Sequence, residues 1–256
     1  MESRIAIITG ATSGFGEAIS RTLVHADWRV IGTGRRTERL AKLHDELKKA
    51  KGKEAFLPLA FDVRDEASTQ AALSSLPTEW KNIDLLVNNA GLALGLEPAH
   101  KASLENWEKM IETNIIGLIR MTHFLLPGMV DRGKGHVINM GSIAGNYPYP
   151  GGNVYGATKA FVKQFSLNLR ADLIGTPLRI TNVEPGLCGD TEFSNVRFQG
   201  DDAKVAAVYQ GVEFIRPEDI ANTVLWISQQ PPHVNINRIE IMPVAQSFSA
   251  LNISRR

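Results

Sequence analysis

The sequence predicts an α/β protein in which one doubly wound parallel sheet of about seven strands carries helices on both faces. Short runs of β-branched and other apolar residues alternate along the chain with longer stretches whose apolar residues recur at helical spacing. The 256 residues are 43% hydrophobic and 21% charged, and no linker rich in Pro, Gly or Ser divides them. We therefore expect a single domain over residues 1–256, built from βαβ units.

The first elements show this alternation most clearly. The buried run at 4–9 predicts a strand, and the glycine turn behind it opens a helix at 14–26. In the helix predicted at 37–51, Leu40, Leu43 and Leu47 share one face while charged residues occupy the other. Further strands are predicted at 28–33, 55–63, 84–88, 136–140, 178–183 and 239–242, and further helices at 67–76, 104–130 and 154–173.

Two stretches fit this alternation less simply. The longest helical stretch contains Gly117 and Pro127, and we expect interruptions at both. Residues 189–202 are polar and irregular, and two helices follow them. The second of these begins at Pro217, because proline suits a first helical position. We expect the segment near 189–213 to form a lid over a substrate.

Charge and cysteine content disfavour several classes of partner. Lys and Arg total 28 and Asp and Glu total 27, so a formal net charge of +1 attracts neither nucleic acid nor an anionic membrane. Cys188 is the single cysteine, and the six histidines lack metal-ligand spacing, so we expect no disulfide and no metal site. No apolar run approaches the ~18 residues of a membrane span, and no leader pattern precedes the first strand. We therefore expect a cytoplasmic protein.

The turn after the first strand has the composition of a dinucleotide-binding site. Between strand and helix lies Thr9-Gly10-Ala11-Thr12-Ser13-Gly14-Phe15-Gly16. Glycines let a pyrophosphate approach the backbone, and the helix N-terminus offers free N–H groups to it. The alternative is a glycine turn without a ligand, which the position between strand and helix disfavours. The run lacks the Lys-Ser/Thr ending of a P-loop, which disfavours nucleoside triphosphate hydrolysis.

The end of the second strand predicts which dinucleotide binds. An NAD site places Asp or Glu there for the ribose 2′-hydroxyl, whereas this chain has Arg35 and Arg36. Guanidinium groups bind a 2′-phosphate, so the sequence predicts NADP(H) as cofactor. The alternative is that both arginines are solvated charges in front of a helix.

The third and fourth strands also end in residues suited to the cofactor. At Asp62-Val63, the Asp62 carboxylate can accept a hydrogen bond from the adenine amino group. Asp62 can equally cap the following helix. Asn89, Ala90 and Gly91 follow the fourth strand, and we expect them to shape the cofactor cleft.

Tyr155 and Lys159 carry the predicted chemistry. Their spacing places both on one face of a helix. A free phenol has a pKa of about 10, and we expect the ammonium to lower the pKa of Tyr155 so that it exchanges a proton with substrate. Alone this pattern more often marks a surface pair, but Ser142 after the fifth strand can hold the substrate oxygen. Asn114, in an apolar helix, either shares a water with Lys159 or distorts the helix.

Together these motifs resemble the short-chain dehydrogenase/reductase superfamily over essentially the whole chain. In order they are Thr-Gly-x-x-x-Gly-x-Gly at 9–16, Asn-Asn-Ala-Gly at 88–91, Asn114, Ser142, Tyr-x-x-x-Lys at 155–159 and Pro185-Gly186. The resemblance implies a Rossmann domain, a tetrad of Asn114, Ser142, Tyr155 and Lys159, a homotetramer, and nicotinamide contacts from Pro185 and Gly186. Thr191 stands five residues after Gly186, whereas the family often has its carboxamide-binding Thr four residues after that glycine.

Three further stretches, at 88–99, 151–159 and 191–198, are similar to two bacterial groups. These are the NADP-dependent 3-hydroxy acid (serine/allo-threonine) dehydrogenases, which also reduce malonic semialdehyde, and the NADPH-dependent sulfoacetaldehyde reductases. Both imply a small anionic aldehyde or hydroxy acid as substrate, and we place the 3-hydroxy acids first. The anion needs a cation, for which Arg197 is the candidate unless it faces solvent. Tyr149, Asn153 and Ser142 are the other expected substrate contacts.

Two other functions remain as alternatives. A sugar-nucleotide epimerase also uses Tyr-x-x-x-Lys, but its glycine run is spaced differently. A non-catalytic NADP-sensing protein is the alternative from another class, and the presence of both Tyr155 and Lys159 disfavours it.

Overall fold

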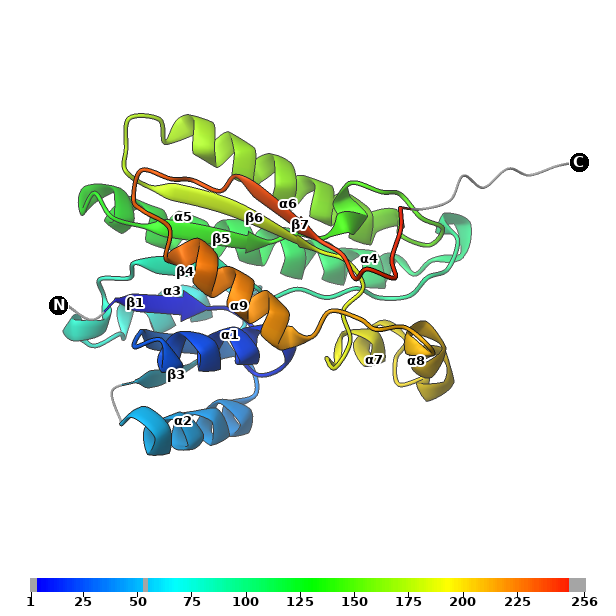
Figure 1. The fold of residues 1–256 in the computed structure, drawn as a ribbon, viewed down its shortest axis with the longest axis horizontal. Helices are drawn as coiled ribbons and strands as arrows, with labels where there is room; N and C mark the ends of the chain where they lie inside the picture. Colours follow the sequence, from blue (N-terminus) through cyan, green and yellow to red (C-terminus); the bar gives the residue numbers. More distant parts are fainter. Residues whose placement is uncertain (1–3, 53–54, 249–256) are drawn as a thin grey trace, which may run out of the picture.

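The computed structural model describes residues 4–52 and 55–248. Its seven strands are all parallel and lie in one sheet in the order β3-β2-β1-β4-β5-β6-β7 (Figure 1). The strands are β1 Ile5–Ile8, β2 Arg29–Gly34, β3 Phe56–Ala60, β4 Leu85–Asn88, β5 His136–Met140, β6 Arg179–Pro185 and β7 Arg238–Ile241. Strand order reverses between β1 and β4, so the predicted doubly wound α/β fold is confirmed.

Helices cover both faces of the sheet (Figure 1). One apolar core packs α1, α2 and α9 against the sheet, and a second core on the opposite face includes residues of α5 and α6. The helices are α1 Gly14–His25, α2 Thr37–Lys51, α3 Glu66–Ser74, α4 Leu104–Ile111, α5 Gly117–Asp131, α6 Asn153–Asp172, α7 Phe193–Arg197, α8 Asp202–Tyr209 and α9 Pro217–Ser228. Among the described residues no helix is both long and apolar enough to cross a membrane.

Burial on both faces of the sheet explains why the sequence of strand β1 is apolar without interruption. Ala6 and Ile8 belong to the core with α1, α2 and α9, while Ile5 and Ile7 belong to the core on the other face. All four side chains are buried. Successive side chains of a strand point to opposite faces, so a strand covered on both faces needs apolar residues throughout.

Of the two interruptions predicted in the longest helical stretch, the structure contains one, close to Gly117. A π-helical turn at Glu112–Ile116 separates α4 from α5, immediately before Gly117. Pro127 lies inside α5 and does not break it, so that prediction is wrong. Pro127 is exposed, so the backbone carbonyl that loses its amide donor there faces the solvent side of the helix.

The segment expected to form a lid contains more structure than predicted. Residues 189–202, predicted as irregular, include the short helix α7, and α8 follows. Both helices lie beyond the carboxyl ends of the strands (Figure 1). This is the end of the sheet at which doubly wound folds bind ligands.

Candidate active site

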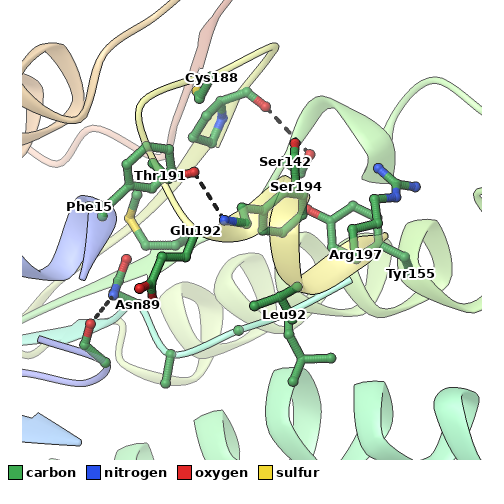
Figure 2. A pocket seen from close by; sticks show the side chains of 18 of the residues that line it. Phe15, Asn89, Leu92, Ser142, Tyr155, Cys188, Thr191, Glu192, Ser194 and Arg197 are labelled. Carbon is green, nitrogen blue, oxygen red and sulfur yellow. Dashed lines mark hydrogen bonds between the residues drawn. The ribbon is translucent and has the colours of Figure 1, made fainter. Parts of the chain in front are cut away.

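A cavity of about 660 Å³ opens at the carboxyl ends of the strands. Its wall combines the turns after β1 to β6 with α7 and the segment after β7. Figure 2 shows Asn89, Ser142 and Arg197 among the side chains that line it. The volume lies in the range of cofactor and substrate pockets. Strands β1 and β4, between which the strand order reverses, both end at this wall.

The turn between β1 and α1 is shaped to receive a phosphate. Gly10 and Gly14 have φ angles of +70° and +52°, which favour glycine. A Cβ at Gly16 would collide with the carbonyl oxygen of Gly10, so the helix packs directly on the turn. Ser13 precedes α1, but its side chain does not cap the helix. The first N–H groups of α1 therefore lack a side-chain acceptor and can bind an anion.

Arg35 and Arg36 both line the cavity, but their surroundings differ. The guanidinium of Arg36 donates to the hydroxyls of Thr12 and Ser13, each at 2.9 Å, so it is part of the phosphate turn. The Arg35 side chain is 64% exposed, and its guanidinium lies 3.8 Å from the carboxylate of Asp62. Arg35 is therefore the more available cation for a 2′-phosphate.

Asp62 lies at the end of β3 and does not cap the next helix. Its carboxylate accepts from the Arg64 guanidinium at 2.6 Å and from the Arg64 backbone N–H at 3.0 Å, whereas Asp65 caps α3. Burial raises the pKa of Asp62, but the bonds from Arg64 outweigh it and hold that pKa below its usual value. Asp62 and Val63 both line the cavity.

Thr9 builds the cleft from behind its wall. Its hydroxyl accepts from the backbone N–H groups of Asn89 and Ala90 at 3.0 and 2.9 Å. The Asn89 side chain in turn donates to the Thr9 carbonyl at 2.8 Å. These bonds join the turns after β1 and β4, and they leave Asn89, Ala90 and Gly91 on the cavity wall.

Helix α6 presents Tyr155 and Lys159 to the cavity from a buried position. The two residues are 8% and 7% exposed, and the Lys159 Nζ lies 5.9 Å from the Tyr155 ring centroid. Lys159 donates to the carbonyl oxygen of Met140, the last residue of β5, at 2.7 Å. The predicted pairing on one helix face is therefore present, with the ammonium anchored to the sheet.

Burial dominates the protonation of both groups. It raises the pKa of Tyr155 to about 12, although hydrogen bonding with Ser142 and the charge of Arg197 act in the opposite direction. It lowers the pKa of Lys159 to about 8. The prediction that Lys159 lowers the pKa of Tyr155 below its usual value does not hold for the chain by itself, because desolvation of the phenol is the larger effect.

Ser142 and Asn114 occupy different places relative to the cavity. Ser142 lies on the wall at the end of β5, and its hydroxyl accepts from the Ala144 N–H at 3.1 Å. Asn114 lies in the π-helical turn, behind the wall, where its amide donates to the Leu92 carbonyl at 2.9 Å and to the Thr158 hydroxyl at 3.0 Å. Asn114 thus lies where its helix is distorted and binds Thr158 of α6 directly.

Arg197, at the end of α7, does not face solvent. Its guanidinium donates to the Tyr149 hydroxyl at 2.6 Å and lies 5.6 Å from the centroid of the Tyr155 ring (Figure 2). Tyr149 also lines the cavity. The structure does not bring Asn153 into the wall, because its side chain donates instead to the Glu97 carbonyl at 3.2 Å.

The nicotinamide end predicted from the family resemblance also lies on the wall. Pro185, Gly186 and Thr191 line the cavity. The side chain of Thr191 would lie 3.3 Å from a Cβ placed on Gly14, so this threonine reaches the phosphate turn. Asp190, which lies between Gly186 and Thr191, adopts a left-handed φ of 53°.

Glu192 is a wall residue that was not predicted, whereas Tyr147 and Gln246 were candidates for the pocket wall and do line it. Glu192 pairs with Arg36 at 2.7 Å and with Arg39 at 2.6 Å. Gln246 accepts from the Leu187 N–H at 2.7 Å and so supports the loop after β6. The Arg36–Glu192 pair spans 156 positions, and no local pattern in a single sequence signals a contact of that separation.

The comparisons agree with this geometry. A family model described as short chain dehydrogenase matches residues 4–202. A probable NADP-dependent dehydrogenase of Haemophilus influenzae is 62% identical over 255 residues, which cover 100% of this chain and 99% of that protein. The NADP-dependent 3-hydroxy acid dehydrogenase YdfG of Escherichia coli strain K12 is 58% identical, covering 98% and 100%. The closed form of serine dehydrogenase complexed with NADP+ matches with a TM-score of 0.95 and 58% identity, covering 98% and 100%.

Proposed function

The chain belongs to the short-chain dehydrogenase family, and from that premise we propose that it transfers a hydride between NADP(H) and a small 3-hydroxy acid or the matching semialdehyde. The observation that carries the substrate class is the position of Arg197, whose guanidinium lies 5.6 Å from the ring of Tyr155 inside the cavity. An arginine beside the proton-transferring group suits a substrate whose carboxylate lies close to its reacting carbon.

The cofactor proposal depends on the turn after β1 and the arginines after β2. The backbone N–H groups at the start of α1 would hold the pyrophosphate, and Arg35 with Arg36 would hold the 2′-phosphate. Asp62 would receive the adenine amino group, and Pro185, Gly186 and Thr191 would border the nicotinamide. When bound, the dinucleotide supplies or takes up the hydride.

Tyr155 is the proposed proton donor for reduction of the aldehyde. Because burial raises its pKa to about 12, the phenol keeps its proton at neutral pH and can deliver it to the developing alkoxide. The Ser142 hydroxyl would hold the same substrate oxygen. Lys159, which donates to the Met140 carbonyl, keeps a positive charge close to Tyr155. That charge would stabilise the Tyr155 phenolate during the reverse reaction.

The names of the relatives support a carboxylate rather than a sulfonate substrate. The relative from Escherichia coli is named for 3-hydroxy acids, and the protein of the matching structure is named for serine. Both names describe a hydroxyl group near a carboxylate. We propose the same substrate class here, in a single-domain subunit that assembles as a homotetramer, as the family resemblance implies.

A comparison of three aldehydes tests the proposal. NADPH consumption would be followed with malonic semialdehyde, with propanal, which has the same chain length but no anion, and with sulfoacetaldehyde. We expect kcat/KM to be at least roughly tenfold higher for malonic semialdehyde than for propanal, because a charge-assisted bond to the substrate is absent with propanal. Equal kcat/KM values for malonic semialdehyde and propanal would overturn the anion-binding role of Arg197. A higher kcat/KM for sulfoacetaldehyde would show that the substrate is a sulfonate rather than a carboxylate. Absence of NADPH consumption with all three would overturn the reaction itself.

A further inference from the structure

The short helix α7 is held by polar contacts at both of its ends. Glu192 immediately precedes the helix, and Arg197 is its last residue. Figure 2 shows the two side chains directed to different parts of the cavity, Arg197 toward Tyr155 and Glu192 away from it. We call residues 191–198 the strap, because they span the cavity between the phosphate turn and the substrate end.

The Glu192 end of the strap is fixed to the cofactor side. One carboxylate oxygen lies 2.7 Å from Arg36 and the other lies 2.6 Å from Arg39. Burial raises the pKa of Glu192, but the bonds from the two arginines outweigh it, so that pKa lies below its usual value and the carboxylate stays charged at neutral pH. Arg36 also donates to Thr12 and Ser13, so the pair reaches the phosphate turn itself.

The Arg197 end of the strap is fixed to the substrate side. The backbone carbonyl of Arg197 accepts from the Gly95 N–H at 3.0 Å, and its guanidinium donates to Tyr149 at 2.6 Å. Because α7 is only five residues long, a shift at Glu192 is transmitted almost rigidly to Arg197.

Apolar packing of the strap includes Phe193, whose ring centroid lies 5.8 Å from the Tyr155 ring centroid, but fully buried side chains are few. Ser194 is the one buried residue of α7 that the structure describes, and Val196 is 44% exposed. Helix α8, which follows, has no buried residue within its described range. The two ends of the strap, at Glu192 and Arg197, are therefore held by polar bonds, while Phe193 packs between them.

We propose that Glu192 is a positioning residue for substrate binding: its pairing with Arg36 and Arg39 ties the strap to the phosphate turn and so holds Arg197 over the substrate. The inference rests on the proposed function. It adds Glu192 to the residues that support substrate binding, although Glu192 would touch neither the substrate nor the reacting atoms. Arg39 carries the larger share of this contact once a 2′-phosphate binds, because Arg36 is then shared between the carboxylate and the phosphate.

Glu192→Gln tests the proposal, since it removes the charge and keeps the size. We expect KM for malonic semialdehyde to rise about fivefold, the scale of a half-exposed ion pair, with little change in kcat. KM for propanal should stay unchanged, because propanal has no anion for Arg197. Arg39→Gln should give the same split. Asp202→Asn, which removes an exposed charge from the neighbouring helix, is the matched control and should leave both substrates unaffected.

A double-variant comparison separates a positioning role from a general loss of structure. If Glu192 acts through Arg197, then Glu192→Gln adds nothing to the KM of Arg197→Ala, whereas independent effects would multiply. Multiplying effects, or an equal rise of KM for propanal, would overturn the proposal. Failure of the proposed function would look different, because the unaltered protein would then show no NADPH-dependent reduction of the semialdehyde.

Discussion

The two sides of the cavity are built on opposite principles. On the catalytic side, α6 buries Tyr155, Thr158 and Lys159 at 8%, 1% and 7% exposure, and hydrogen bonds attach them to Asn114 and to the end of β5. On the substrate side, α7 and α8 bury Ser194 alone among their described residues. The groups that we propose to react are thus positioned by a core, whereas those that we propose to face the substrate are positioned largely by bonds that can open and re-form.

The contrast between the two sides explains how one site can be both rigid and accessible. The proposed proton transfer requires Tyr155 to stay within hydrogen-bond reach of a fixed point, which a buried helix provides. Substrate must enter and leave, which a segment with few buried contacts allows without disturbing the core. The cavity wall formed by the strap is therefore the part of the site that we expect to move.

Replacement of Tyr155 by Phe should have the largest effect, because it removes the proton donor from the rigid side. We expect kcat to fall by roughly a thousandfold, the scale of general acid catalysis. NADPH binding and the thermal midpoint should change little, since Phe fills the same buried volume. Tyr149→Phe is the matched control on the mobile side, and we expect it to alter KM more than kcat. If the Tyr155→Phe variant kept the kcat of the unaltered protein, Tyr155 would not be the proton donor.

The pH dependence should come next in size and should differ between the two reaction directions. Burial raises the pKa of Tyr155 to about 12, so the protonated form that reduction needs prevails at neutral pH. Oxidation needs the phenolate, whose fraction grows roughly tenfold per pH unit below the pKa. Initial rates between pH 6 and 8 should therefore rise with pH for oxidation of the hydroxy acid and stay flat for reduction. Flat profiles in both directions would show that Tyr155 does not carry the proton.

Arg197→Ala should have a moderate effect that is confined to substrate binding. Loss of a charge-assisted bond corresponds to roughly a tenfold to hundredfold rise in KM for the anionic aldehyde. The value of kcat at saturation should change far less, because Tyr155 and Lys159 stay in place on α6. Steady-state kinetics with malonic semialdehyde measures both. A fall in kcat with KM unchanged would contradict the division between the two sides.

Hydrogen exchange should reveal the smallest effect, a difference in local stability. Backbone amides of α7 and α8 are expected to exchange faster than those of α6, because few buried side chains protect them. Addition of NADP should slow exchange in α7, since Arg36 contacts both Glu192 and the phosphate turn. Mass spectrometry of peptic fragments measures this. Equal protection of α6 and α7 would contradict the comparison.

The sequence predicted the parts of the molecule whose determinants are local. The helix at Thr37–Lys51 and the strand at His136–Met140 have the predicted bounds, because the leucines of the first and Val137 and Ile138 of the second lie within the elements themselves. The glycine turn, Tyr155 and Lys159 also lie where their motifs predicted, on the wall of one cavity.

The remaining features depend on contacts between distant segments. Burial raises the pKa of Tyr155, whereas the spacing of Tyr155 and Lys159 alone predicted a lowered pKa. The placement of Asn153 outside the wall follows from its bond to the loop at Glu97. The Glu192 pairs join α7 to α2 and had no counterpart in any local pattern.

The π-helical turn at Glu112–Ile116 lets the chain hold one additional residue while the helices on either side keep their faces. Such a turn holds one residue more than an α-helix of the same rotation, so deletion of a single residue there would restore an uninterrupted α-helix. The helices before and after the deletion would keep their angular positions, and Met110, which is fully buried, would stay in the core. The deletion would instead alter the turn that holds Asn114 against Leu92 and Thr158, so its cost would fall on the cavity wall rather than on the core.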